Sequence, residues 1–196
     1  MKTIALGFRV KSGFAIAVVL RGPASAPGAI AREIVELSDP DVVETRQPYH
    51  HGFSRHEEDE RQIAKRVEIV ERCTRQSIAA LLKDERFDGA TWRSAGLVVG
   101  SVIDPATVGN PHIRAHASEG KLFRSVLESA LQAHGISCDV IVDKHLAVKA
   151  AAGLKRGDEE IRSVVSGFGK ALGGSWRAEE KAASTAAWLA LFAAPA

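Results

Sequence analysis

The chain has 196 residues, a length that suits one sizeable hydrophobic core and is short for two. Its 45% hydrophobic and 26% charged content is ordinary for a globular protein, and a formal net charge of +2 is too small to indicate a partner by itself. Cys73 and Cys138 lie far apart and form no CxxC pair, which suits a reducing compartment and two buried thiols.

We expect neither a secretory signal nor a membrane span. The apolar run at the start of the chain is broken by Arg9 and Lys11, whereas a signal needs a longer apolar core and a small-residue cleavage site. The longest apolar stretch, residues 182–196, is interrupted by Ser184 and Thr185 and is shorter than the about 20 residues of a span. The expected location is therefore the cytoplasm, with no membrane partner.

The first part of the chain has the pattern of three strands. Residues 3–10 and 14–20 are rich in strand-forming side chains, and the KSG turn at residues 11–13 predicts that they form a hairpin. Residues 29–37 are expected to form a third strand, although the two glutamates within them would also suit a helix. Residues 38–53 contain two prolines and are expected to be irregular.

The remainder alternates helices and strands. Residues 96–103 and 137–143 are short apolar runs that predict buried strands. Helical spacing or composition predicts helices over residues 57–83, 121–134, 159–172 and 177–192. This order predicts one α/β domain over residues 1–196, with a mixed five-stranded sheet, antiparallel over its first three strands and parallel over its last two, and helices on both faces.

Three short stretches carry a family pattern. Residues 6–9 read LGFR, residues 13–15 read GFA, and residues 179–191 read EEKAASTAAWLAL. Together with the element order, they resemble ribonuclease H-like proteins, most closely the RuvC-like branch of Holliday junction resolvases. In that branch a Gly-x-Asp element ends the first strand, Gly-aromatic-Ala begins the second, and acidic residues precede an Ala/Leu-rich closing helix. The resemblance spans most of the chain and implies a ribonuclease H-like fold.

The resemblance also implies positions for metal-binding carboxylates, and the sequence departs from the family there. Arg9 takes the place of the strand-one aspartate, and the closing-helix positions fall on Lys181 and Ser184. Gly100 and Ser101 stand where an acid is expected after the fourth strand. Two-metal cleavage needs several carboxylates that hold ions about 4 Å apart, and a cation would repel those ions. We therefore expect no metal, no cofactor and no metal-dependent nuclease activity.

Basic residues would gather near one edge of the cleft of such a fold. Arginine and lysine bind phosphate without a metal. The sequence therefore favours a catalytically silent module that binds an anionic ligand, either nucleic acid or a nucleotide phosphate. Few aromatic residues accompany the basic ones, so that no base-stacking platform is evident. The candidate anion-binding residues are Arg9, Lys11, Arg114, Lys144 and Lys181.

An enzyme of unknown reaction is the first alternative, and it would use the segment 104–119 after the buried strand. His112, Arg114 and His116 are spaced by two, so that an extended backbone would direct all three to one side, to bind an anion or move a proton. The segment also suits a polar loop that caps the next helix, with Ser118 as N-cap. The candidate catalytic residues are Asp104, His112, His116 and Glu119.

Two further motifs are weaker. His50, His51 and His56 lie near the acidic run 57–60 and could bind Zn²⁺ or Fe²⁺, but their spacing matches no metal signature, and acids are common in the first turn of helices. Residues 167–170 read GFGK and only superficially resemble a phosphate loop, because the other Walker positions do not match.

A homo-oligomeric assembly protein is the second alternative. The apolar end of the closing helix would then be buried against another subunit, most simply in a homodimer. Trp188, Leu189 and Phe192 are expected to be structural, packed either against the sheet or against that subunit.

Overall fold

The computed structural model describes residues 2–51 and 55–192. Across these residues one sheet has the strands β1 (Lys2–Lys11), β2 (Phe14–Arg21), β3 (Gly28–Glu36), β6 (Ala90–Val99) and β7 (Cys138–Val142). Their spatial order is β3-β2-β1-β6-β7. Pairing is antiparallel from β1 to β3, whereas β6 pairs in parallel with both β1 and β7. The predicted mixed sheet is confirmed.

The described part of the chain contains the helices α1 (Glu60–Leu82), α2 (Pro111–Gln132), α3 (Leu146–Leu154), α4 (Asp158–Leu172) and α5 (Ala178–Phe192). None of these has the length and apolar composition that a membrane-crossing helix needs. Short 3₁₀ turns occur at η1 (Val43–Arg46), η2 (Glu85–Phe87), η3 (Pro105–Thr107) and η4 (Asp143–His145). The small strands β4 (His50–His51) and β5 (Arg55–His56) pair with each other.

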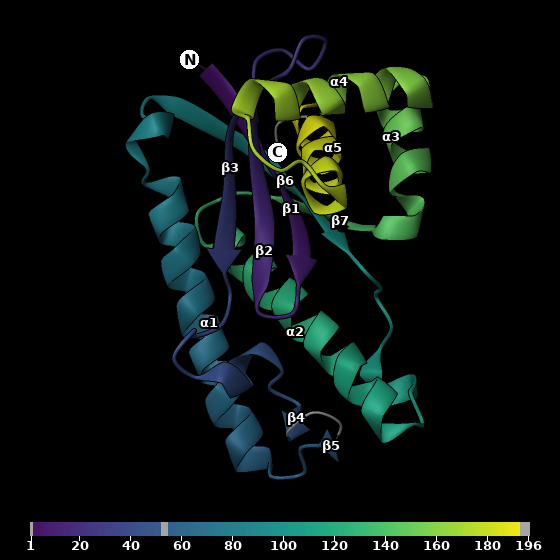
Figure 1. The fold of residues 1–196 in the computed structure, drawn as a ribbon. Coiled ribbons are helices and arrows are strands. Elements are labelled where there is room, and N and C mark those ends of the chain that lie inside the picture. The colour runs from purple at the N-terminus through teal and green to yellow at the C-terminus, as the bar shows by residue number, and fades with distance from the viewer. Residues whose placement is uncertain (1, 52–54, 193–196) are drawn as a thin grey trace.

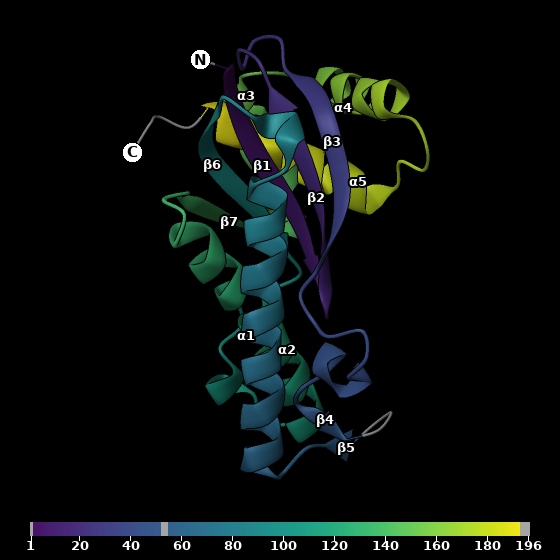
Figure 2. The ribbon, with the colours of Figure 1, turned by 90° about the vertical axis from the view of Figure 1, so that its left-hand side faces the viewer.

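Helices cover both faces of the sheet, as expected. Figures 1 and 2 show α1 and α2 on one face and α3, α4 and α5 on the other. Strand β1 separates the two cores by period-2 alternation: Leu6 and Phe8 pack toward α1 and α2, whereas Ala5 packs toward α3, α4 and α5. The β4–β5 hairpin lies beyond the end of the sheet, beside the first turns of α1 and of α2 (Figure 2).

The segment expected to be a loop over residues 104–120 is helical in its second half. Helix α2 begins at Pro111, and the side chain of Asn110 accepts a hydrogen bond from the Ile113 amide at 3.1 Å. Asparagine at the N-cap followed by proline at the first helical position is a strong start signal. The expected N-cap Ser118 therefore lies inside the helix, and the expectation of an extended backbone here is wrong.

Other boundaries differ less. Strand β6 ends at Val99, and the next four residues, expected to continue it, are exposed because the chain leaves the sheet at Gly100. Helix α3 was not expected, since its alanine-rich sequence gives little polar contrast. Residues 167–170 lie within α4, as expected for helix rather than a phosphate loop. Both cysteine thiols are free and are half-buried rather than buried.

The closing helix is buried along most of its length, but its end is not. Trp188 is fully buried, and its indole donates a hydrogen bond to the Ala24 carbonyl at 2.8 Å. Leu189 is half-buried and packs against the core. Phe192 remains 43% exposed, so that the expected packing of this ring against the sheet is wrong. Its burial in a homodimer stays a prediction that light scattering can test.

Helix α5 lies unusually close to the sheet because small residues face each other. A Cβ atom on Gly7 of β1 would lie 1.9 Å from the Ala183 carbonyl oxygen, and one on Gly96 of β6 would lie 2.7 Å from that of Ala186. Both contacts are with helix backbone, which cannot move aside as a flexible side chain can. Glycine in the two central strands and alanine in the helix are therefore required for this packing.

Gly7→Ala should accordingly destabilise the protein by at least about 1–3 kcal/mol, because the new methyl group overlaps the backbone of α5. Urea-induced unfolding followed by circular dichroism measures this change. Gly167→Ala is the matched control: a Cβ there meets nothing within 4 Å, and alanine in a helix is favoured over glycine by roughly 0.5–1 kcal/mol. Equal stability of the two variants would contradict the close packing.

Candidate functional site

A hollow of about 310 Å³ opens at the edge of the sheet where the parallel strands β1 and β6 end. The residues that line it include Arg9 and Lys11 of β1, Gly100 and Ser101 after β6, and His116 of α2. In open α/β sheets, ligands bind beyond the carboxyl ends of the strands. This hollow is therefore the first candidate site.

Arg9 bridges the ends of three strands. Its guanidinium lies 3.1 Å from the Asp143 carboxylate, which follows β7, and donates to the Val98 carbonyl of β6 at 3.4 Å. The Arg9 side chain is only 14% exposed, whereas that of Asp143 is 47% exposed. The cation is thus held in place by an acid that itself remains in contact with water.

Two lysines extend the positive edge. Lys11 Nζ lies 3.5 Å from the Glu179 carboxylate at the start of α5. A hydrogen bond from the Glu179 backbone amide, together with Lys11 and Arg9, holds the pKa of this carboxyl below its usual range. Lys144 is exposed in η4, next to Asp143.

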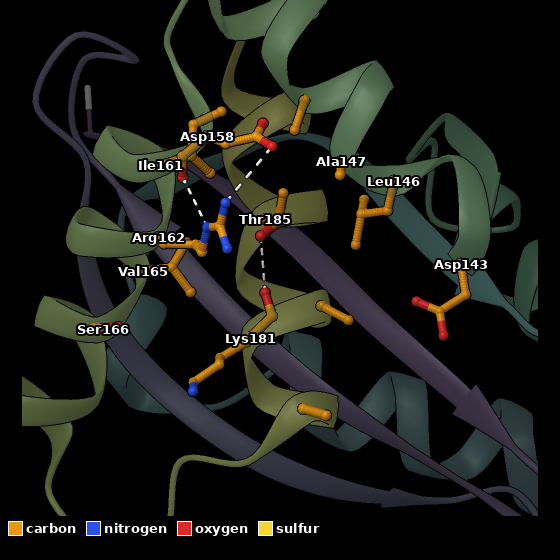
Figure 3. Close-up of a pocket in the computed structure, with 13 residues that line it drawn as sticks. Asp143, Leu146, Ala147, Asp158, Ile161, Arg162, Val165, Ser166, Lys181 and Thr185 are labelled. Atoms are coloured by element: carbon orange, nitrogen blue, oxygen red, sulfur yellow. Dashed lines mark hydrogen bonds and ion pairs between the residues drawn. The ribbon is translucent and has the colours of Figure 1, made fainter.

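Lys181 faces a second, larger hollow of about 520 Å³ between α3, α4 and α5. Figure 3 shows it with Asp143 at the same pocket and with the Asp158–Arg162 ion pair of α4, whose charged atoms are 3.7 Å apart. Arg9 lines the first hollow and its partner Asp143 lines the second. The Arg9–Asp143 ion pair therefore lies between the two hollows.

Arg114 does not join the other four basic residues. Its guanidinium donates to the carbonyl oxygens of Val108 at 2.8 Å and Gly109 at 3.3 Å, just before α2. In a helix, residues two positions apart lie on different faces, so that Arg114 turns away from His112 and His116. The expectation that these three side chains share one side is wrong.

A histidine cluster lies beside the first hollow. His112 and His116 are one helical turn apart in α2, with their Nε2 atoms 3.3 Å apart. The ring of His50, from β4, lies 4.5 Å from that of His116 and 5.3 Å from that of His112, measured between centroids. Glu119, one turn further along α2, completes the group.

His50 and Glu119 form a buried pair. The distance from His50 Nδ1 to Glu119 Oε1 is 2.7 Å, and both side chains are almost completely buried. Burial raises the pKa of Glu119 to about 7, a rise that His116 opposes from 3.5 Å. Burial also lowers the pKa of His50. Both shifts favour the uncharged forms of the two groups, and a neutral imidazole carries a lone pair on one of its nitrogens.

The other candidates from the sequence lie apart from this cluster. Asp104 caps η3 and lies 3.8 Å from Lys121. His51 faces outward and lies 3.3 Å from Glu57. The sequence placed His50 and the α2 histidines in separate groups, because only the fold brings β4 against α2. The spacing of four between His112 and His116 was the available signal, once the segment is assigned to a helix.

Comparison with known proteins gave matches at the level of structure alone. No protein-family model matches the chain, and no curated protein sequence matches it. The structure of RuvC from Thermus thermophilus in complex with a Holliday junction substrate matches with a TM-score of 0.55 and 12% identity, over 97% of this chain and 93% of that one. The fold is that of the RuvC-like ribonuclease H proteins.

Two further RuvC-like structures support this assignment. A second Thermus thermophilus RuvC structure has a TM-score of 0.54 and 13% identity, over 96% of this chain and 93% of that one. The yeast mitochondrial Holliday junction resolvase Ydc2 has a TM-score of 0.50 and 8% identity, over 96% and 79% respectively. Identities this low establish the shared fold only.

A RuvC-like fold implies a pair of Mg²⁺ ions at this edge, where the acids Asp143 and Glu179 are paired with Arg9 and Lys11. Among the described residues that line the first hollow there is no aspartate or glutamate. Glu180 is occupied as a helix cap, since it accepts from the Arg177 amide at 2.8 Å, and the Ser184 hydroxyl donates to the carbonyl of Glu180 at 2.6 Å. Mg²⁺ requires oxygen ligands, and Arg9 places a fixed positive charge among these groups instead.

The buried pair gives a stability prediction. His50→Leu leaves the Glu119 carboxyl without its shortest hydrogen bond, which should cost about 1–3 kcal/mol in urea unfolding measured with EDTA present. His51→Leu, in the same short strand but with a side chain 70% exposed, should change stability by less than about 0.5 kcal/mol. A loss of the same size in both variants would contradict the pairing.

Proposed function

We propose that this chain is a catalytically silent, RuvC-like module that binds a nucleic acid through its phosphate groups. The observation that supports it most is Arg9, a largely buried guanidinium at the carboxyl end of the central strand β1, where ligands of open sheets bind. A protein of the same fold was solved with a Holliday junction substrate, which makes a nucleic acid the first ligand to test.

The ion pairs at this edge do not prevent such binding. The pair of Arg9 with Asp143 and that of Lys11 with Glu179 are both partly exposed. Exposed ion pairs contribute about 0–1 kcal/mol, so that a phosphate can replace the Glu179 carboxylate at little cost. Arg9 is only 14% exposed, but its partner Asp143 is 47% exposed and can turn to solvent when a phosphate binds. Lys144 and Lys181 are exposed and lie on either side of these pairs.

Binding should be independent of Mg²⁺ and strongly dependent on salt. If Arg9, Lys11, Lys144 and Lys181 each neutralise one phosphate of duplex DNA, log K should fall with log salt with a slope of about −3.6, because counterions are released. Fluorescence anisotropy of labelled duplex and branched DNA in EDTA measures this slope.

Matched variants distinguish binding at the proposed site from a nonspecific effect of the protein's net charge. Lys181→Gln should weaken binding and reduce the slope by about 1. Lys83→Gln removes the same charge after α1, before β6 begins and therefore at the opposite end of the sheet, and should change nothing. Asp143→Asn frees Arg9 and should tighten binding. A DNA affinity that does not change with salt concentration, or that requires Mg²⁺, would contradict the proposal that these residues bind phosphate.

The second experiment addresses catalysis. Branched DNA, single strands and RNA–DNA hybrids should all remain intact in the presence of Mg²⁺ or Mn²⁺, as seen on denaturing gels. Arg9→Asp should not introduce cleavage, because a two-metal site needs all of its ligands placed together. Metal-dependent cleavage by the wild-type protein that disappears in Asp104→Asn or Glu180→Gln would overturn the silent-module proposal.

A further inference from the structure

We propose that His50, His112 and His116 bind one divalent transition-metal ion, with Zn²⁺ as the metal of first choice. One nitrogen of each ring lies within 4.8 Å of those of the other two. The site is distinct from the strand-end position discussed above, and it does not depend on nucleic-acid binding.

The distances within the cluster suit a metal. Two nitrogens bound at about 2.0–2.1 Å to a tetrahedral Zn²⁺ lie roughly 3.3 Å from each other. The Nε2 atoms of His112 and His116 are 3.3 Å apart. Histidines four residues apart on one helix face regularly supply two zinc ligands, because one helical turn brings their rings side by side.

The third ligand is indicated by an unpaired buried atom. Nε2 of His50 is buried and has no hydrogen-bond partner among the described residues, although its ring lies against the other two. Buried polar atoms are nearly always paired, and an exception needs an explanation. A metal ion between the three rings would satisfy this nitrogen.

Glu119 has the position of a residue that orients a metal ligand. It lies 2.7 Å from Nδ1 of His50, the nitrogen away from the cluster. A carboxylate that accepts a hydrogen bond from Nδ1–H leaves the lone pair on Nε2, which is the arrangement found behind most metal-bound histidines. Glu119 is therefore a positioning residue in this site, and not itself a ligand.

The ligand set selects the class of metal. Three imidazoles suit Zn²⁺ and its transition-metal neighbours, whereas Mg²⁺ requires oxygen ligands. His112 and His116 are exposed while His50 is buried, so that the fourth coordination position faces solvent and would hold water.

Zinc titration of the full chain without an affinity tag, stripped with EDTA and followed by calorimetry, tests the proposal. One ion should bind per chain. His112→Ala and His116→Ala should each lower the affinity by more than the about 10–100-fold that follows when a residue that only orients a ligand is changed, since each removes a ligand. Both residues are exposed, so the variants should fold, which circular dichroism checks. His51→Ala, the neighbour that faces Glu57, should bind as the wild type does.

Glu119→Gln separates positioning from packing. It keeps the shape of the side chain but loses the charge, and should lower zinc affinity by about 10–100-fold. The visible spectrum of bound Co²⁺ should keep the shape that three nitrogens and one water give. Zinc binding that is absent, or equally tight in wild type, His112→Ala and His116→Ala, would overturn the site. These measurements contain no DNA. A negative zinc result would therefore not bear on the proposed nucleic-acid binding, and a negative DNA-binding result would not bear on the zinc site.

Discussion

The close contact between helix α5 and the two central strands is the constraint on which the rest of the molecule depends. Gly7 and Gly96 have no side chains, so that the backbone of α5 at Ala183 and Ala186 can lie directly against the strands. This contact fixes where α5 begins, and hence where Glu179 and Lys181 lie relative to the end of β1. The charged edge of the sheet is thus a consequence of backbone packing several residues away.

Local patterns in the sequence were sufficient for the sheet and insufficient for the sites. The strict period of two along β1 places Arg9 on the same face as Ala5 and opposite to Leu6 and Phe8. The start of α2 was missed because its histidines suggested an extended loop, although Asn110 and Pro111 carried the helix signal. The approach of His50 to α2 joins segments about sixty residues apart and leaves no trace in local spacing.

The charge at the end of the sheet is more mixed than the sequence predicts. Arg9 and Lys11 line one hollow, and the sequence could not show that Asp143 and Glu179 would lie beside them. These acids reduce the net field of the cleft without filling it. The edge is better described as a set of exchangeable ion pairs than as a uniformly positive surface. His116 lines the same hollow and also belongs to the histidine cluster.

The position of β1 has a consequence for synthesis of the protein on the ribosome. It is the first strand to emerge, yet its partner β6 begins at Ala90 and its covering helix α5 begins at Ala178. At about 5–20 residues per second, roughly 10–40 s pass before α5 is available. The edge of β1 stays unpaired until β6 has been made, and the apolar face under α5 stays uncovered for the whole interval; such surfaces are bound by chaperones and otherwise drive aggregation.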